Sequence, residues 1–205
     1  PVQYILGESA FLDIIVKVDP SVLIPRPETE ELVLLADRYL KESCKKNLRI
    51  LDIGTGSGCI AIALKNMYPD SEVSALDVSE KALGVARENA AMNSAEIDFR
   101  KQNILNFEEE VPFPCKFNMI ISNPPYVTES DKMLMQKNVL DHEPATALYI
   151  SDEDPLIFYR KIAEFARLNL ADGGVIFLEI NENYAEQLKS LYLAFGFPEI
   201  EIRKD

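Results

Sequence analysis

The sequence predicts an α/β protein with an open, mostly parallel sheet and helices on both of its faces. From residue 48 onward, short apolar runs alternate with longer amphipathic runs, and this alternation of strands and helices is typical of a parallel sheet. The chain has 205 residues, of which 47% are hydrophobic. This composition is sufficient for a packed core in one sizeable domain or two small ones.

The first segment, residues 1–27, is expected to form a β-hairpin and a linker ahead of the main domain, residues 28–205. Residues 9–18 are rich in β-forming side chains and predict a short hairpin or strand. The Pro25–Pro27 segment is expected to be extended and to stay outside any helix, because each proline fixes φ and removes an N–H donor. A helix is expected at about 28–42, where apolar residues recur at helical spacing.

The main domain is expected to alternate between strands and helices up to its end. Strands are expected at 48–53, 72–78, 97–102, 117–122 and 175–180, and a last strand is expected to start at 199–202. Helices are expected at 59–67, 80–92, 155–170 and 183–195. Ser79 is the expected N-cap of the second helix, Asp172–Gly174 is expected to be a turn, and the stretch 127–154 has no clear period. Ligands of such sheets bind at the carboxyl ends of the strands, so motifs at those ends are the candidates for a site.

The net charge of the chain is -13 and its pI is about 4.6. An acidic surface repels the phosphates of nucleic acids, so a direct nucleic-acid partner is not expected. The charge excludes neither a protein partner nor a local basic patch.

The cysteines and the single histidine do not form a metal-binding pattern. Cys44, Cys59 and Cys115 are scattered without C-x-x-C spacing, and His142 is the only histidine, so no metal is expected. The scatter fits reduced thiols in a cytoplasmic protein. No apolar run approaches the ~18 residues of a membrane span and no signal peptide is visible, so neither membrane insertion nor export is expected.

Three other features have plain structural interpretations. His142 lies in a polar stretch and is interpreted as a solvated loop histidine, with a catalytic base as the alternative. Glu108–Glu110 is interpreted as a solvated loop. Cys59 follows a glycine turn on an apolar helix, so we expect it to be buried by packing.

The motif Asp52–Gly58, Asp-Ile-Gly-Thr-Gly-Ser-Gly, lies between an expected strand and an expected helix. Glycines allow a sharp turn and let a ligand lie directly against the backbone. The dinucleotide fingerprint G-x-G-x-x-G would need glycine or alanine where this chain has Cys59. An acid at position 52 would repel phosphates but could hold an ammonium group, and S-adenosylmethionine has an amino group and no phosphate. The residues predicted to bind this cofactor are Asp52, Gly54, Thr55, Gly56, Ser57 and Gly58.

The ends of the next two strands supply further cofactor candidates. Asp77 lies 77 − 58 = 19 residues after Gly58, close to the spacing of about 20 at which an acid bonds ribose hydroxyls. We expect Asp77, like the acid at the start of the glycine motif, to be ionised near neutral pH. Asn103 could meet the edge of the adenine, and Ile104 could cover its face. The alternative is that the glycines only form a tight turn and that Asp77 only caps the next helix.

The motif Asn123-Pro124-Pro125-Tyr126 directly follows the expected strand 117–122. Successive prolines lack N–H donors, so the carbonyls beside them are free to accept other bonds. The Asn123 side chain and the Pro124 carbonyl are predicted to accept the two N–H bonds of a planar NH2 group, which would aim a weakly nucleophilic nitrogen at a methyl donor. Tyr126 could stack on that group or close one side of it. The alternative is that this motif is only a rigid loop.

These motifs resemble those of the HemK/PrmC family of protein-(glutamine-N5) methyltransferases. The residues that carry the resemblance extend over the whole chain, and they are Gly7, Phe11, Val22–Glu30, Asp52–Gly58, Asp77 and Asn123–Tyr126. The pairing of Ile-Pro-Arg-Pro-Glu-Thr-Glu with Asn-Pro-Pro-Tyr is much more specific than the glycine motif alone. It favours the branch of the family that methylates the glutamine of the Gly-Gly-Gln tripeptide in peptide chain release factors, which would be the protein partners.

The resemblance implies a seven-stranded, Rossmann-like methyltransferase fold that uses S-adenosylmethionine and is preceded by a short β-hairpin. It implies that the glycine motif, Asp77, Ile104 and Asn123 border the cofactor, and that Asn123–Tyr126 hold the glutamine. Asn123, Pro124 and Tyr126 are the predicted catalytic residues, while Pro125, Phe11 and Arg26 join them as predicted substrate-binding residues, with Phe11 and the Pro25–Thr29 segment as walls.

The chain also differs from the usual pattern of this family. It begins at Pro1 without methionine, and we interpret it as a fragment that lacks the small N-terminal helical domain of the family. The family usually continues into another strand, whereas this chain ends at Asp205. Asn103 occupies a position that is often aspartate, which bears on the adenine contact.

Two other enzyme functions and one non-enzymatic function compete with this interpretation. An adenine-N6 nucleic-acid methyltransferase uses the same kind of Asn-Pro-Pro-Tyr motif, but it must flip its base and hold phosphates with a basic surface. A related glutamine methyltransferase acts on a ribosomal protein. A non-catalytic adaptor would show decay of the two motifs, and both are intact here.

Overall fold

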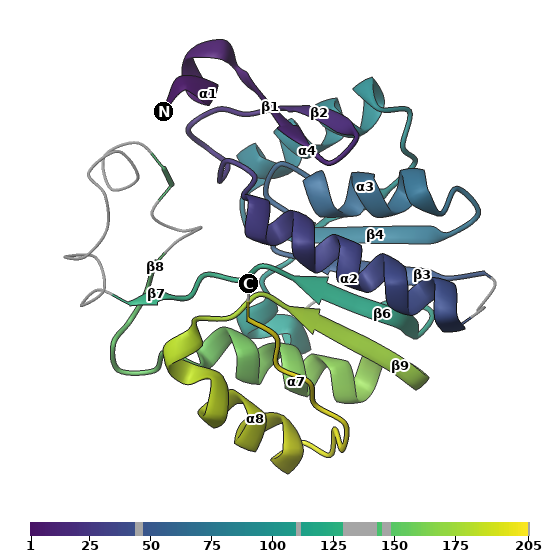
Figure 1. Cartoon of the computed structure of the whole chain (residues 1–205), viewed down its shortest axis with the longest axis vertical. Helices are drawn as coiled ribbons and strands as arrows, with labels where there is room; N and C mark the ends of the chain where they lie inside the picture. Colours follow the sequence, from purple (N-terminus) through teal and green to yellow (C-terminus); the bar gives the residue numbers. More distant parts are fainter. Residues whose placement is uncertain (44–46, 110–111, 129–142, 145–148, 205) are drawn as a thin grey trace.

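The computed structural model describes residues 1–43, 47–109, 112–128, 143–144 and 149–204, and its centre is a parallel sheet (Figure 1). The sheet consists of β3 (Arg49–Ile53), β4 (Glu72–Asp77), β5 (Asp98–Lys101), β6 (Phe117–Ser122) and β9 (Leu170–Leu178). Their order is β5-β4-β3-β6-β9, and each neighbouring pair is parallel. The predicted open parallel α/β sheet is therefore confirmed.

The expected number of strands is wrong. The described part of the chain has five strands in this sheet rather than seven. Residues 199–202, which were expected to start a last strand, pair with no strand in the described residues. Ile200 packs against a buried apolar cluster, but Ile202 is 41% exposed. The Glu-Ile-Glu-Ile alternation therefore lacks a continuous buried face that would hold a strand in place.

Helices cover both faces of the sheet. The helices on one face are α2 (Pro27–Ser43), α3 (Cys59–Met67) and α4 (Glu80–Met92). The elements on the other face are η1 (Ile104–Glu109), α7 (Ile157–Asn169) and α8 (Ala185–Ala194), with η3 (Glu182–Tyr184) leading into α8. Ile50 belongs to the first core and Leu51 to the second, as the alternation of side chains along a strand requires, and both are fully buried.

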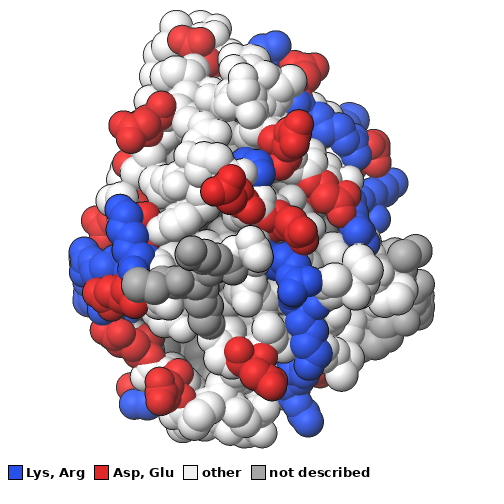
Figure 2. Space-filling model, turned by 90° about the vertical axis from the view of Figure 1, so that its right-hand side faces the viewer, with Lys and Arg blue, Asp and Glu red and all other residues white. Residues whose placement is uncertain are grey.

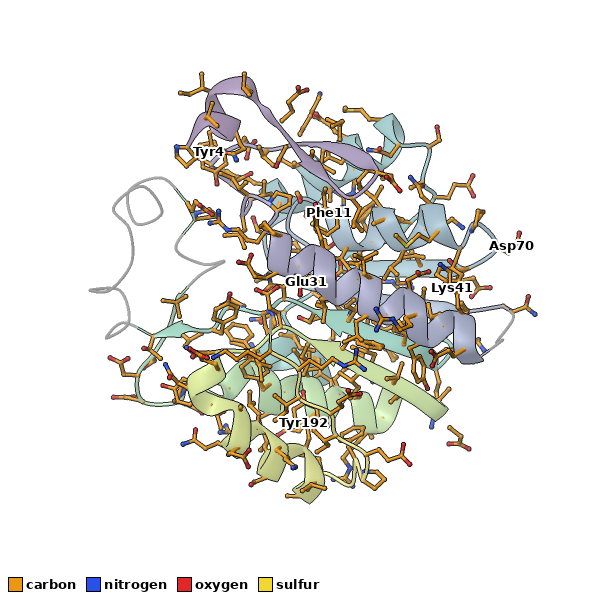
Figure 3. The ribbon with its side chains drawn as sticks, in the orientation of Figure 1. Tyr4, Phe11, Glu31, Lys41, Asp70 and Tyr192 are labelled. Atoms are coloured by element: carbon orange, nitrogen blue, oxygen red, sulfur yellow. The ribbon has the colours of Figure 1, made fainter. Side chains whose placement is uncertain are left out.

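The N-terminal segment forms the predicted hairpin and joins the main core. Strands β1 (Glu8–Phe11) and β2 (Ile14–Lys17) are antiparallel, and Phe11 lies inside the same apolar cluster as α2, α3 and α4 (Figure 3). The backbone N–H of Leu12 donates to Glu30 Oε1 at 2.9 Å, which fixes the hairpin turn to α2. A short helix, α1 (Val2–Leu6), precedes the hairpin and was not predicted. It ends at Gly7, whose left-handed φ of 75° suits glycine.

Two boundaries differ from expectation because of proline and glycine. Helix α2 begins at Pro27 itself, since the first position of a helix needs no N–H donor and suits the fixed φ of proline. Strand β9 begins at Leu170, so the expected Asp172–Gly174 turn lies within it. Leu170 pairs with Phe117 and Val175 with Met119, so a step of five residues on β9 matches a step of two on β6, and the glycines form a bulge instead of ending the pairing.

Within the described residues of the long polar stretch, β7 (Val127–Thr128) pairs in parallel with β8 (Tyr149–Ile150). His142, Cys44 and Glu110 lie outside the described residues. Cys59 is buried in the first core, as expected, and Ser79 caps α4 by accepting a bond from the N–H of Ala82 at 3.2 Å. No helix in the described ranges is both long and apolar enough to cross a membrane.

A buried asparagine of α4 joins the hairpin to the glycine loop. Asn89 is 0% exposed. Its Nδ2 donates to the carbonyls of Ser57 at 2.8 Å and Lys17 at 3.0 Å, and its Oδ1 accepts from the N–H of Lys17 at 2.6 Å. Asparagine is a poor residue for a helix interior, so its presence at a buried position indicates a specific bonding role.

We expect Asn89→Ala to lower the free energy of unfolding by roughly 2–3 kcal/mol, because it leaves buried backbone groups without partners. Glu88→Ala is the matched control, since it removes only an exposed ion pair with the same Lys17 and should cost less than about 1 kcal/mol. Urea unfolding measures both values, and equal losses in the two variants would contradict the assignment.

Candidate active site

The site residues meet at the carboxyl ends of β3 and β6. Ile53, the last residue of β3, pairs with Ser122, the last residue of β6, and the Ser122 hydroxyl donates to the Ile53 carbonyl at 2.6 Å. From β3 the chain moves outward through β4 and β5 and then returns to the other side of β3. The loops after β3 and β6 therefore diverge from adjacent positions, and a ligand-binding crevice forms at such a point.

The three glycines of the first loop have different tasks. All of them have positive φ, at 74° for Gly54, 55° for Gly56 and 83° for Gly58. A Cβ at Gly58 would lie 3.1 Å from the Cβ of Ala86, so this glycine allows α3 and α4 to pack closely. A Cβ at Gly54 or Gly56 would meet nothing within 4 Å, so the backbone there borders open space in which a ligand can lie.

Asp77 fixes the glycine loop from the end of β4. Its Oδ2 accepts from the N–H of Gly56 at 2.9 Å, and its Oδ1 accepts from the N–H of Ser79 at 2.8 Å. Burial raises the pKa of this carboxyl above its ordinary value. Each carboxylate oxygen can accept a second bond, so the present contacts leave capacity for a diol. The contribution of Asp77 to the turn is thus visible, and its bond to ribose stays a prediction.

Asp52 is a fully buried carboxyl at the end of β3, with 0% exposure. Its Oδ2 accepts from the Thr55 hydroxyl at 2.6 Å, whereas its Oδ1 has no hydrogen-bond partner within the described residues. Burial, with a smaller contribution from Asp77, raises the pKa of Asp52 to about 7. A carboxyl with this pKa is only partly ionised near neutral pH, whereas its ordinary pKa would leave it fully ionised. A buried oxygen without a partner is costly, and a cationic ligand would relieve that cost.

The residues after β5 form a structured turn. Asn103 Oδ1 accepts from the N–H of Leu105 at 3.0 Å and so caps η1, and Ile104 is buried. The adenine contacts assigned to these two residues stay predictions.

The motif after β6 is tied to helix α2 and strand β9 by a chain of hydrogen bonds. Asn123 Nδ2 donates to the hydroxyl of Thr29 at 3.0 Å. The Thr29 hydroxyl donates to Glu179 Oε2 at 2.7 Å, and the Tyr126 hydroxyl donates to Glu179 Oε1 at 2.9 Å. Burial, and then the neighbouring Glu179, raise the pKa of Tyr126 far above its ordinary value, so its phenol is neutral.

Sequence reasoning missed Glu179, although a signal for it was present. Glu179 lies directly after β9, at the same edge of the sheet as Asp52 and Asp77. Its backbone N–H donates to the Ser122 carbonyl at 3.1 Å, so the sheet itself fixes its position beside Asn123. Asp52 and Asp77 are site candidates because each lies near the end of a predicted strand, and the same criterion includes Glu179.

The two predicted wall residues are both engaged within the fold. Phe11 is fully buried in the first core. Arg26 is partly exposed, and its Nη2 contacts Glu143 Oε1 at 2.5 Å. The Glu143 side chain is only 1% exposed, and its Oε2 has no partner in the described part of the chain. Whether these residues contact a substrate stays a prediction. Pro124 is buried and Pro125 half-buried beside Asn123.

Comparison with known proteins identifies the class. Residues 33–149 match the family model described as Methyltransferase small domain. The fold is similar to the crystal structure of ribosomal protein L11 methylase from Lactobacillus delbrueckii subsp. bulgaricus, with a TM-score of 0.63 and 19% identity over 93% of this chain and 80% of that one. The Rossmann-like methyltransferase fold expected from the sequence is thereby confirmed, and the chain has the fold of a methyltransferase.

Sequence relatives narrow this class to one family. The chain is 47% identical to a release factor glutamine methyltransferase of Flavobacterium psychrophilum, over 100% of this chain and 71% of the relative. It is 45% identical to the protein of the same name from Bacteroides thetaiotaomicron, over 100% of this chain and 72% of that relative. The chain belongs to the release factor glutamine methyltransferase family.

The raised pKa of Asp52 predicts a pH-dependent stability. The folded-state pKa of about 7 exceeds the unfolded value of about 3.9, so the folded protein binds the proton more tightly between these values. The stabilising contribution of protonated Asp52 to the free energy of unfolding is fully present below pH ~4 and is lost as the pH rises to ~7. We expect the free energy of unfolding of Asp52→Asn, relative to the wild type, to increase across this window by at most about 1.4 kcal/mol per pH unit.

Urea unfolding of both proteins at a series of pH values from ~4 to ~8 measures this difference. Taking the difference removes the titration of the exposed carboxyls, which both proteins share. A difference that stays constant over the window would show that Asp52 is ionised in the folded protein.

Proposed function

We propose that this chain transfers a methyl group from S-adenosylmethionine to the side-chain amide nitrogen, N5, of the glutamine in the Gly-Gly-Gln tripeptide of a peptide chain release factor. Family membership supports the substrate class. The observation that carries the proposal is the pairing of Ile53 with Ser122, because it starts the Asp52–Gly58 loop and the Asn123–Tyr126 loop at adjacent positions. One loop has the features of a cofactor site, and the other has acceptors for a planar NH2 group.

The residues of the first loop fit S-adenosylmethionine. The unpaired Oδ1 of Asp52 is a suitable partner for its ammonium group, and the open backbone at Gly54 and Gly56 leaves room for a ligand. Asp77 retains acceptor capacity for the two ribose hydroxyls. When bound, the cofactor supplies a methyl group on a positively charged sulfur, which is activated towards nucleophiles. In this proposal, Thr55, Ser57, Gly58, Asn103 and Ile104 complete the cofactor site.

The residues of the second loop hold the glutamine amide. An amide nitrogen is a weak nucleophile because its lone pair is delocalised, so positioning and electrostatics must supply the rate. Asn123 Oδ1 and the Pro124 carbonyl accept the two N–H bonds, which raises the electron density on the nitrogen and fixes its direction. The nitrogen gains a methyl group and loses one proton to water, so no side chain has to act as a base. Tyr126, as a neutral phenol, closes one side of the site.

The proposed partner is a protein, and the proposed location is the cytoplasm, where release factors act. The chain has a net charge of -13, and on the face shown in Figure 2 Lys and Arg side chains lie among Asp and Glu side chains. Such a mixed surface supports contact with a protein better than non-specific contact with a phosphate backbone.

Mass spectrometry of a release factor, after incubation with this protein and methyl-labelled S-adenosylmethionine, tests the function. We expect one added methyl group on the Gly-Gly-Gln glutamine. Asn123→Ala should lower the rate by roughly 100-fold or more, because it removes an acceptor that positions the nitrogen. Asn66→Ala, an exposed asparagine of α3, is the matched control and should keep the wild-type rate. Label on adenine in a nucleic acid, and none on the release factor, would refute the proposal.

Calorimetry tests the assignment of Asp77 to the cofactor. Loss of charge-assisted bonds in Asp77→Ala should weaken the binding of S-adenosylmethionine by about tenfold or more. Asp70→Ala is the control, since Asp70 is exposed and lies on a loop at the far end of the sheet from this site (Figure 3). An unchanged Kd in a folded Asp77→Ala protein would remove Asp77 from the cofactor site.

A further inference from the structure

We propose that Thr29 and Glu179 set the direction of the Asn123 side-chain amide, so that its carbonyl oxygen, and not its NH2 group, faces the nitrogen that is methylated. This inference rests on the proposed function. It makes Thr29 and Glu179 positioning residues, because they act on the substrate through Asn123.

The three residues come from different parts of the fold and converge at one edge of the sheet. Thr29 lies in the first turn of α2 and is 3% exposed. Asn123 follows β6, and Glu179 follows the neighbouring strand β9. The N–O distance from Asn123 to Thr29 is 3.0 Å, and the O–O distance from Thr29 to Glu179 is 2.7 Å. Since the hydroxyl is shielded from water, these two bonds determine how it is oriented.

The donor-to-acceptor direction of the hydrogen bonds from Asn123 through Thr29 to Glu179 follows from counting protons. A carboxylate only accepts hydrogen bonds, and a hydroxyl has a single proton. The Thr29 hydroxyl therefore gives its proton to Glu179 Oε2 and can only accept from Asn123. The atom of Asn123 that faces Thr29 must then be a donor, which is Nδ2. An amide is planar, so Oδ1 points away from Thr29 on the other branch of the side chain.

This direction matters because the two ends of an asparagine amide have nearly the same shape but opposite hydrogen-bonding character. With Oδ1 towards the substrate, Asn123 accepts from the glutamine NH2. With the amide reversed, the NH2 group of Asn123 would face the NH2 group of the glutamine. Both are donors, so the substrate nitrogen would lose an acceptor. A hydroxyl held by a carboxylate discriminates between these two states, whereas an apolar side chain at position 29 would not.

Glu179 holds the opposite end of the same motif. Its other oxygen, Oε1, accepts from the Tyr126 hydroxyl at 2.9 Å. One carboxylate thus orients the first and the last residue of Asn123–Tyr126, and the backbone bond from Glu179 to Ser122 places it next to that motif.

The test compares Thr29→Val, which keeps the shape of the side chain but removes the hydroxyl, with Thr29→Ser, which keeps the hydroxyl. Both are measured in the full chain with a release factor as substrate. We expect kcat of Thr29→Val to fall by about tenfold, the effect of one neutral hydrogen bond, while its Kd for S-adenosylmethionine stays unchanged. Thr29→Ser should restore kcat to within about twofold of the wild type. If the valine variant does not fold, Thr29→Ala replaces it with the same expectation.

A double-mutant cycle separates this role from a general structural one. If Thr29 acts through Asn123, adding Thr29→Val to Asn123→Ala should cause no further loss of kcat. Losses that multiply in the double variant would overturn the proposal, as would a wild-type kcat in Thr29→Val.

A second measurement does not depend on activity. The side-chain NH2 signal of Asn123 in a nitrogen-15 NMR spectrum should show slow hydrogen exchange in the wild type and in Thr29→Ser, and fast exchange in Thr29→Val. Equal exchange in all three would overturn the orientation of the amide. Failure of the wild type to methylate a release factor would refute the proposed function instead, and the NMR result would still decide the orientation.

Discussion

The arrangement of the site depends on the parallel pairing of β3 with β6. That pairing places Ile53 beside Ser122, and the chain leaves the sheet from both residues at once. Two side chains then fix the loops that follow this pair of strands. Asp77, from β4, holds the glycine loop, and Glu179, from β9, holds the Asn-Pro-Pro-Tyr motif. Four neighbouring strands thus each contribute one anchor, so the relative positions of the two loops follow from the pairing of the sheet and from side chains held at its edge.

Buried acids at this site reduce the stability of the fold. Asp52 has an oxygen without a partner, and burial raises its pKa to about 7. Glu143 also has an unpaired oxygen in the described residues, although its other oxygen contacts Arg26. Neither oxygen stabilises the fold as it stands, because burying a polar atom without a hydrogen-bond partner is unfavourable. Such local conflicts with stability are expected where binding or chemistry takes place.

The sequence predicts those elements of the fold that depend on residues close together along the chain. The strands of the central sheet, the hairpin and the glycine turn follow from period and residue type, and these agree with the structure. What it does not predict depends on distant partners. The Asp172–Gly174 turn lies within a bulged strand because β6 pairs on either side of it. Residues 199–202 pair with no strand in the described residues, since only one of their two isoleucines packs against the core. Asn89 and Glu179 are single polar residues whose importance comes from groups 32 and more residues away in the sequence.

Asn89 couples the stability of the hairpin to that of the glycine loop. Its side chain bonds Lys17 at the end of the hairpin and Ser57 in the glycine loop, so both segments share one anchor. Thermodynamic linkage is reciprocal: a ligand that orders the loop through this anchor also secures the hairpin, and a displaced hairpin weakens the loop by the same coupling free energy. The hairpin is, in energetic terms, a remote part of the glycine loop, and its attachment can be followed by the protection of backbone amides from hydrogen exchange.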